Sequence, residues 1–556
     1  MPTGGVQINW GTGTSTLTHV GGNWGIDADI TGFNNLILSG TGYKQMNNNL
    51  TITGNLDIRS GITFYMYNVG NYKIFGPGDT LTLGDNAALL NRTAAPDTAF
   101  PTQFSYYNIS PTSTVYLYST NGNNQILFTG KNVQYGNLTF GYTKTVTHDG
   151  IADLIIKGNW NTNGSTFSDN PTTPKNISVA GATVRIDYYT ATPGITLTLN
   201  GIINQTLYSA GNNTLNLANI VFDGIGTKTL GDGNDVVNIS GNLTINPNVT
   251  VTTTRNITFS GANWNNNGIF TQTAGVTTFN SSANQFLNPG PDNAQNYFYQ
   301  LYFVNGTSKR INNNGLRATG RLAVRTPGLT LYMGSFIHNL AVDSFTVIAG
   351  GIIHTDSSSF NFYRNGAQYI NIPNFKAVNV STATGGVKYM LSNWTLTGDL
   401  TIGAGTTLST NAASYSISLG GNWINNGTFT YNTSTVTFNG STSPITIQTN
   451  GTAGGVNDFY YVNFSPSAPV TYNLTSPITR FRRTSVIGNN ATVVLNGNTL
   501  YMGSNVASDK NLTINGTLTI NANATLRINN QSSICTIDVY GRLNVVGNSS
   551  TNYATI

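Results

Sequence analysis

One short block of sequence recurs along the chain and constrains its fold more than any other feature. Each of the six tryptophans directly follows an asparagine. Three of these pairs open the same pattern, in which Asn-Trp is followed by an Asn-rich turn, a glycine and a phenylalanine. These three blocks begin at Asn159-Trp160, Asn263-Trp264 and Asn422-Trp423. A block repeated in this way indicates one small supersecondary unit used many times, since each unit must pack on the next to bury its apolar side chains.

The second and third blocks continue in parallel beyond their first phenylalanines, Phe270 and Phe429. In both copies another phenylalanine, Phe279 or Phe438, follows nine residues later at the end of a Thr-rich segment. A second unit, Asn-Leu-Thr-Ile, occurs at 49–52, 242–245 and 511–514, with a close variant at 399–402. The segments richest in these repeats lie near 20–60, 136–170, 242–303, 393–464 and 511–548.

Apolar residues within the repeats alternate with polar ones at every second position. Leu50, Ile52, Leu56 and Ile58 follow this pattern, with Gly54-Asn55 between the two pairs. A period of two places one set of side chains inside and the other outside a β-strand. Gly and Asn tolerate a positive φ, so they end strands in tight turns. The sequence therefore predicts an all-β chain of short strands, with turns too closely spaced for crossover helices.

The spacing of the blocks is irregular, which favours a solenoid over closed domains. Trp160 and Trp264 are 104 residues apart, whereas Trp264 and Trp423 are 159 residues apart. In a solenoid each coil contacts only its neighbours, so insertions become loops. We therefore expect an elongated parallel β-helix with loop insertions, as one continuous β-repeat region over residues 1–556 and a fragment of a longer chain. Tandem β-sandwich domains are the alternative.

The repeated aromatic residues are interpreted as structural landmarks of the interior. A tryptophan fills a large volume, and its indole N–H needs a partner when it is buried. A row of exposed tryptophans for stacking on sugars is the alternative interpretation. The landmark residues are Trp24, Trp160, Trp264, Trp423, Phe270, Phe279, Phe429 and Phe438.

Charged residues make up only 8% of the chain, and the net charge of +5 is spread along its length. A nucleic-acid-binding protein would gather its basic residues in one patch, so no nucleic-acid partner is predicted. The densest basic cluster is Arg480, Arg482 and Arg483, which fits a protected strand edge or, alternatively, a site for an acidic glycan. No apolar run approaches the roughly 20 residues of a membrane span.

The sequence predicts no catalytic residues and no cofactor, and we therefore expect that the chain is not an enzyme. The four histidines are isolated and show no zinc-binding spacing. A polysaccharide-cleaving β-helix would need paired carboxylates, for which Asp27 with Asp29 and Asp232 with Asp235 are the best candidates. Asp232, Asn234 and Asp235 are interpreted as a plain Gly/Asp turn, and oxygen ligands for Ca²⁺ are the alternative interpretation.

The string from Gly421 to Phe429, followed by Thr435 to Gly440, resembles the repeats of very large Bacteroidetes cell-surface adhesins. These include gliding-motility adhesins exported by the type IX system. The resemblance implies an extracellular location at the cell surface, with the cell envelope or like subunits as partners. It also implies a role in adhesion or filament formation, possible contacts with surface glycans, and no membrane span in this chain. A polysaccharide-binding or polysaccharide-degrading β-helix, such as a lyase or phage tailspike, is one alternative, and a self-assembling sheath subunit is another.

Overall fold

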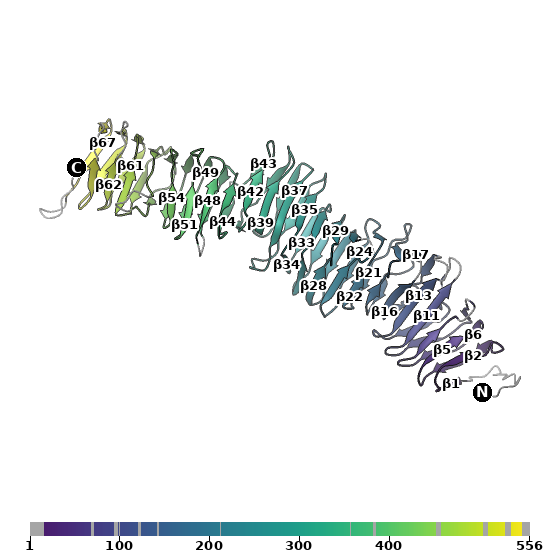
Figure 1. The fold of residues 1–556 in the computed structure, drawn as a ribbon. Coiled ribbons are helices and arrows are strands. Elements are labelled where there is room, and N and C mark those ends of the chain that lie inside the picture. The colour runs from purple at the N-terminus through teal and green to yellow at the C-terminus, as the bar shows by residue number, and fades with distance from the viewer. Residues whose placement is uncertain are drawn as a thin grey trace. The chain divides into compact units, whose positions relative to one another are not determined.

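The computed structural model divides into two compact units, residues 1–281 and 282–556. The described residues are 16–67, 70, 72–93, 98, 100–119, 124–141, 144–211, 213–355, 357–381, 385–451, 457–503, 510–528 and 535–547. These residues form strands and turns, with no helix among them. Both units are parallel β-solenoids, with about 21 turns in total. The prediction of an all-β parallel β-helix is thus confirmed (Figure 1).

In most of the first unit, three successive strands make one coil, and each pairs with the strand three places later; β10 (Thr80–Leu83) and β11 (Ala88–Thr93) instead pair with β12 (Tyr106–Ile109) and β13 (Thr114–Ser119). The Cα partners include Leu215↔Val237, Ile220↔Leu243 and Lys228↔Val251, one pair on each of the three sides. All pairings between the described strands are parallel, which excludes antiparallel sandwiches there. The strands of this representative coil pair are β26 (Thr214–Leu217), β27 (Asn219–Phe222), β28 (Gly226–Leu230), β29 (Val236–Ile239), β30 (Leu243–Ile245) and β31 (Val249–Thr253).

The second unit repeats this arrangement with coils of unequal length. Paired residues lie as close in sequence as Ser359 and Ala377, or as far apart as Ile445 and Tyr472. One sheet of this unit contains β59 (Ile478–Phe481), β62 (Thr499–Met502) and β65 (Thr525–Ile528). A second contains β57 (Tyr461–Phe464), β60 (Ser485–Ile487), β63 (Lys510–Ile514) and β66 (Cys535–Val539). The irregular spacing of the sequence repeats therefore corresponds to turns of different length between strands that remain in register.

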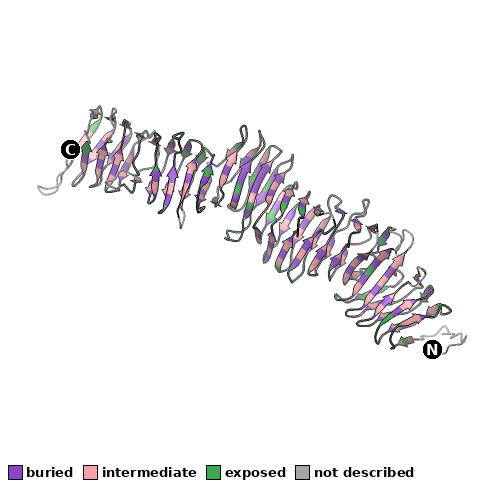
Figure 2. Ribbon diagram, viewed as in Figure 1, coloured by how far each residue is buried: buried purple, intermediate pink, exposed green. Residues whose placement is uncertain are grey.

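The interior of each unit follows from the two-residue alternation. Buried residues alternate with partly exposed ones along most strands, as Figure 2 shows. In one coil of the first unit, Leu215, Leu217, Ile220, Phe222 and Leu230 are all buried. Burying one such side chain contributes about 1.5–3 kcal/mol. One coil has too few of these side chains to form a closed core by itself, so its stability depends on the coils above and below.

The turns explain why the chain is so rich in asparagine. Of the described non-glycine residues with positive φ, all are asparagines except Lys131 and Ser414. Asparagine tolerates this left-handed conformation better than most residues. Glycine is required where turns of successive coils touch: a Cβ on Gly261 would lie 1.7 Å from the carbonyl oxygen of Gly241.

The asparagine of each Asn-Trp pair forms a hydrogen bond with the backbone of the next coil. The side-chain oxygen of Asn159 accepts the backbone N–H of Thr183, one coil later, at 2.8 Å. Asn422 accepts the N–H of Thr446 in the same way, also at 2.8 Å. The equivalent bonds of Asn23 and Asn393 are made to Tyr43 and Ser416. The asparagine thus satisfies a backbone donor of the next coil, while the adjacent tryptophan points the other way.

Candidate functional site

The tryptophan and phenylalanine landmarks meet inside the solenoid as aromatic clusters. Trp423 is buried and lies edge-to-face with Phe429, at 4.8 Å between ring centroids, and with Phe459 at 5.0 Å. Phe438 is a further neighbour of Trp423 at 6.4 Å. In the first unit Trp264 contacts Phe270 at 5.0 Å and Phe279 at 5.7 Å. Each phenylalanine of a repeat block therefore packs on the tryptophan of the same block.

Two features of the tryptophans differ from the sequence-based expectation. The buried indole N–H groups of Trp160, Trp394 and Trp423 have no hydrogen-bond acceptor. Their neighbours are aromatic rings instead, such as Phe167, which lies perpendicular to Trp160 at 5.0 Å. Trp24 is only partly buried and stacks on His19 at 4.3 Å. Trp10 lies outside the described residues.

The calcium candidates Asp232, Asn234 and Asp235 lie in one turn between β28 and β29. Asp232 and Asn234 are exposed, whereas Asp235 is buried. The Oδ2 atom of Asp235 accepts the N–H groups of Asp232 at 2.9 Å and Ser209 at 3.0 Å. This oxygen is therefore already used to hold its own turn to the preceding coil.

The other acidic pair, Asp27 and Asp29, is exposed in the turn after β2 (Trp24–Ile26). The N–H of Asp29 donates to Oδ1 of Asp27 at 3.2 Å, which is a local turn contact. The two carboxylates thus belong to one surface turn.

Buried aspartates instead form clamps between coils. Asp187 accepts the N–H groups of Ala210 and Gly211 from the next coil, each at 2.8 Å, and that of Gly164 from the preceding coil at 2.6 Å. Arg185 lies 2.8 Å from the same carboxylate. Burial alone would raise the pKa of Asp187, but these donors hold it below its ordinary value. All 20 acidic residues of the chain are aspartates, whose short side chain suits such turn contacts.

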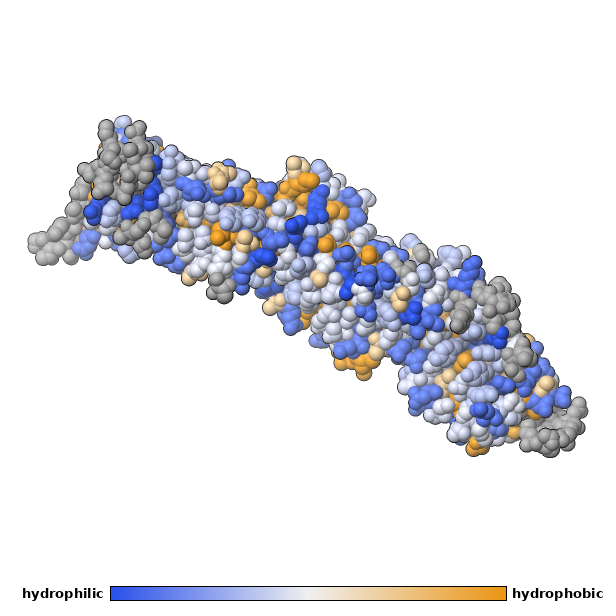
Figure 3. Space-filling view, in the orientation of Figure 1, coloured by the Kyte–Doolittle hydropathy of each residue, from blue (hydrophilic) through white to orange (hydrophobic). Residues whose placement is uncertain are grey.

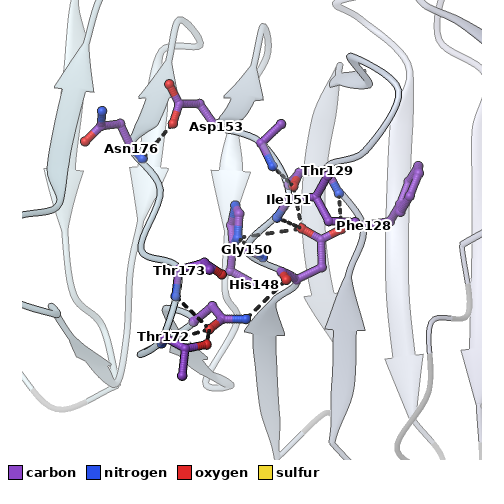
Figure 4. A network of polar contacts seen from close by, with 12 residues as sticks. Phe128, Thr129, His148, Gly150, Ile151, Asp153, Thr172, Thr173 and Asn176 are labelled. Atoms are coloured by element: carbon purple, nitrogen blue, oxygen red, sulfur yellow. Dashed lines mark hydrogen bonds and ion pairs between the residues drawn. The ribbon is translucent and has the colours of Figure 1, made fainter.

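A polar network around His148 contains the residue types of a catalytic triad but not its geometry (Figure 4). The hydroxyl of Thr129 donates to Asp149 at 2.5 Å, and the Thr129 N–H donates to the same carboxylate at 2.8 Å. His148 accepts the N–H of Gly150 at its Nδ1 atom, at 2.9 Å. Since the threonine is bonded to the carboxylate and not to the histidine, the histidine is not placed to activate it. The network fixes the turn after β17 (Thr145–His148).

His338 in β41 (Ile337–Leu340) is fully buried in the second unit. Its Nδ1 atom accepts the N–H of Leu316 at 3.0 Å, and its ring stacks on Phe360 at 4.9 Å. Burial lowers the pKa of His338 to about 3, opposed in part by a backbone hydrogen bond with Met333. The folded state therefore holds this histidine in its neutral form.

The burial of neutral His338 is expected to make the folded protein less stable in acid. Between the ordinary pKa of 6.5 and the folded value of about 3, the unfolded chain binds a proton that the folded chain does not, so stability falls as the pH falls. At pH 5 the loss attributable to His338 is about 2 kcal/mol. His338→Asn keeps an acceptor for Leu316 and does not titrate. Urea titrations should show that the free energy of unfolding falls less between pH 7 and pH 5 for this variant than for the wild type. An equal fall in both proteins would contradict the assignment of this acid sensitivity to His338.

Four lysines are buried among backbone carbonyl oxygens, which sequence reasoning did not foresee. Lys228 is fully buried, and its Nζ atom donates to the carbonyl oxygens of Gly201 at 2.6 Å, Ile203 at 3.2 Å and Ile225 at 3.1 Å. It also donates to the Gln205 side chain at 2.7 Å. Burial lowers the pKa of Lys228. The ammonium group ties two successive turns together without a carboxylate among these four acceptors.

The same arrangement recurs along both units. Lys44 reaches the carbonyl oxygens of Gly21 and Gly22, one coil earlier, and Lys388 reaches Arg364 and Gly366. Burial lowers the pKa of Lys309 and of Lys388 to about 8. Three of these lysines pair in register with a buried glutamine of the previous coil; the pairs are Gln205↔Lys228, Gln285↔Lys309 and Gln368↔Lys388.

The strongest candidate for a functional surface lies on the second unit, where arginines and tyrosines form two rows. The first row follows one position through β59, β62 and β65, with Arg480, Tyr501 and Arg527 as register partners. The guanidinium carbons of Arg480 and Arg527 lie 5.1 and 5.2 Å from the Tyr501 ring centroid. Arg527 also donates to the Tyr501 hydroxyl at 3.0 Å. The tyrosine thus holds one guanidinium from the coil before it and one from the coil after it.

The second row lies at the neighbouring turns. The rings of Tyr431 and Tyr460 are stacked at 6.3 Å, with Arg482 at 5.2 Å from the first ring and Arg483 at 5.2 Å from the second. Arg483 also donates to the Tyr460 hydroxyl at 3.1 Å. We call the four arginines Arg480, Arg482, Arg483 and Arg527, together with Tyr431, Tyr460 and Tyr501, the basic surface.

One buried carboxylate anchors the basic surface. Asp458 lies 2.6 Å from Arg482 and 3.5 Å from Arg480. Four arginines and one aspartate leave this surface with a charge of +3 in a chain whose total is +5. The arginine cluster seen in the sequence is therefore joined by Arg527, which the periodic register alone brings beside it.

In the part of the chain that the structure describes, no group of three or more His, Cys, Asp or Glu side chains could hold a metal ion. The described residues also include no helix long and apolar enough to cross a membrane. The chain matches no protein-family model, no curated protein and no solved structure at a significant level.

Proposed function

We propose that this chain is an extracellular repeat protein that forms a structural and adhesive stalk or filament at the cell surface. The proposal rests mainly on the hydrogen bonds of the buried polar side chains. The buried side chains of Asp187, Lys228 and Gln205 all bond to backbone groups of neighbouring coils. Such bonds join each coil to the next and serve the mechanical continuity of the solenoid.

The candidate carboxylates support a non-enzymatic role. A glycosidase needs two carboxylates facing each other across a substrate, one of them able to give up a proton. Asp149, Asp187 and Asp235 each accept backbone N–H groups within or between turns. Both oxygens of Asp149 and Asp187 and the Oδ2 atom of Asp235 are engaged in holding the fold, whereas the buried Oδ1 atom of Asp235 has no hydrogen-bond partner among the described residues. This use of the carboxylates favours a structural role over acid–base chemistry.

The surface composition also supports an extracellular stalk. The visible face mixes hydrophilic with nearly neutral residues, and its hydrophobic residues form small separate groups (Figure 3). Hydroxyl and amide side chains supply most of this polarity, since charged residues are only 8% of the chain. Such a surface can form many weak hydrogen bonds with glycans or with other surfaces.

The proposal is tested in the organism that makes the chain. Antibodies against the purified protein should label intact, unpermeabilised cells. Deleting the gene should reduce surface attachment or gliding, and should leave the turnover of extracellular polysaccharides unchanged. Normal attachment and gliding in the deletion strain, or labelling only after permeabilisation, would count against the proposal.

The register of the coils favours a second candidate, a self-assembling filament subunit. β67 (Arg542–Val545) pairs in parallel register with β64 (Thr517–Ile520), and Val545 and the following Val546 are exposed. Exposed apolar residues on a coil can pack against a further coil of the same kind. Electron microscopy of the purified chain distinguishes the candidates, because a subunit should form long fibres and a stalk should remain as single particles.

A further inference from the structure

We propose that the basic surface of the second unit binds an acidic polysaccharide, with the guanidinium groups of Arg480 and Arg527 as its principal contacts. This inference deepens the proposed adhesive function and rests on it for the biological context. It adds a ligand class and the residues that recognise it.

The first step is the preorganisation of the arginines. An arginine side chain loses about 2 kcal/mol of rotamer entropy when it becomes fixed on a ligand. Tyr501 contacts Arg480 of the strand before it and Arg527 of the strand after it, at 5.1 and 5.2 Å from the ring centroid, so much of this ordering is complete before any ligand arrives. Arg527 is exposed and the side chain of Arg480 is 15% exposed, and the exposed N–H groups of a guanidinium stacked in this way can still donate hydrogen bonds to a carboxylate or sulfate.

The second step is the spacing of the charges. Arg480 and Arg527 are separated by two strand spacings, so their guanidinium groups lie about 10 Å apart along the row. A polymer with regularly repeated acidic groups can meet both at once, and simultaneous binding strengthens the complex far beyond either contact. A single small anion would use only one of them.

The third step is the second row, which widens the charged surface. Arg482 and Arg483 are held on Tyr431 and Tyr460, one on each ring. Asp458 neutralises one of the four positive charges and holds Arg480 and Arg482 from below, at 3.5 and 2.6 Å. The remaining charge of the basic surface can steer a polyanion to this face, because the rest of the chain carries few charges.

The contacts of Tyr501 favour one class of ligand over the others. Proteins that bind single-stranded nucleic acids stack bases on open aromatic faces, and many neutral-sugar sites also use an open ring face. A guanidinium group from the strand on each side lies 5.1 or 5.2 Å from the ring centroid of Tyr501, and Arg527 also donates to its hydroxyl. The basic surface therefore offers hydrogen-bond donors and positive charge without an open central ring, which favours an acidic polysaccharide over a nucleic acid or a neutral glycan.

The test measures binding of the full chain to alginate, chondroitin sulfate, neutral dextran and duplex DNA. Alginate supplies carboxylates only and chondroitin sulfate supplies both carboxylates and sulfates, so the two separate the acidic groups. We expect binding to at least one of them, no binding to dextran, and a large loss of affinity near 1 M salt, where the Debye length is about 3 Å. The double variant Arg480→Gln/Arg527→Gln should weaken binding by about tenfold or more.

The chain offers a matched control elsewhere in the same unit. Arg310 and Arg325 lie over Tyr332 and Tyr302, at 4.0 and 3.4 Å. Arg310→Gln/Arg325→Gln removes the same charge and the same kind of stacking, and should change affinity by less than about twofold. Thermal melting of both variants verifies that each remains folded.

Three results would overturn the inference. They are no binding to either acidic polysaccharide, an equal loss of polysaccharide affinity in the two double variants, and tighter binding to duplex DNA than to the acidic polysaccharides. These results are distinguishable from a failure of the proposed function. A chain without polysaccharide affinity would still label the cell surface and support attachment if it acts only as a stalk.

Discussion

Replacing Trp423 with alanine is expected to lower the free energy of unfolding by about 3–5 kcal/mol. The indole is buried between Phe429 and Phe459, and its strand neighbours Leu400 and Ile447 lie on either side in register. Removing it leaves a large cavity that these neighbours cannot fill without breaking their own register. The effect is measured by urea unfolding followed by far-ultraviolet circular dichroism, because fluorescence would change with the tryptophan itself.

Trp24 provides the control for this prediction. It also follows an asparagine, and Asn23 makes the same inter-coil bond, but the indole of Trp24 is partly exposed against His19. Trp24→Ala should cost less than about 1 kcal/mol, as expected for a partly exposed side chain. Equal losses for the two variants would show that the Asn-Trp block acts through its backbone and not through the packing of the indole.

Replacing Lys228 with methionine is expected to destabilise the first unit by about 3 kcal/mol or more. Methionine has nearly the same length and fits the same space, so the change removes the donor with little change in volume. The carbonyl oxygens of Gly201, Ile203 and Ile225 and the Gln205 amide oxygen then lose a charged donor while they remain near the interior. Amide hydrogen exchange in residues 201–206 and 225–230 should increase before global unfolding.

Lys157→Met is the matched control, since Lys157 is exposed. It should change stability by less than about 0.5 kcal/mol. Replacing a buried charge with an apolar isostere is sometimes neutral, because the charge itself costs free energy to bury. If Lys228→Met unfolds at the same urea concentration as the wild type, the carbonyl cage contributes nothing to stability.

The fold could be predicted from the sequence because its determinants are local. Leu50, Ile52, Leu56 and Ile58 alternate with polar residues, and all four are buried in β6 (Leu50–Ile52) and β7 (Leu56–Ile58). The closely spaced turns excluded crossover helices, and the irregular spacing of the repeat blocks predicted a parallel β-helix, because a solenoid accommodates insertions as loops. Asn and Gly at the turns matched the positive φ values found at Asn163 and Gly164.

The buried lysines were missed although the sequence contains a signal for them. Lys228 stands two residues before Leu230, and Lys388 two residues before Met390, so the alternation places each lysine on the inward side. A general expectation that lysines are exposed outweighed this pattern. The carbonyl oxygens that bind Lys228 come mainly from a turn one coil earlier, and that contact depends on coil length, which the sequence does not state.

The basic surface could be predicted only in part, for the same reason. Arg480, Arg482 and Arg483 are neighbours in sequence, but Arg527 joins them through the register of β59, β62 and β65. A shift of one residue in the pairing of β62 with β65 would move Arg527 to the opposite face of its strand. Only the three-dimensional register could therefore show that Tyr501 lies between two guanidinium groups.

We propose that this solenoid binds its ligands without changing them. The most direct measurement is the molar mass of an acidic polysaccharide, determined by light scattering after prolonged incubation with the full chain. We expect the polymer to be bound while its molar mass stays constant. A steady decrease in molar mass, abolished by replacing an aspartate such as Asp149 or Asp235, would identify the chain as an enzyme and contradict this account.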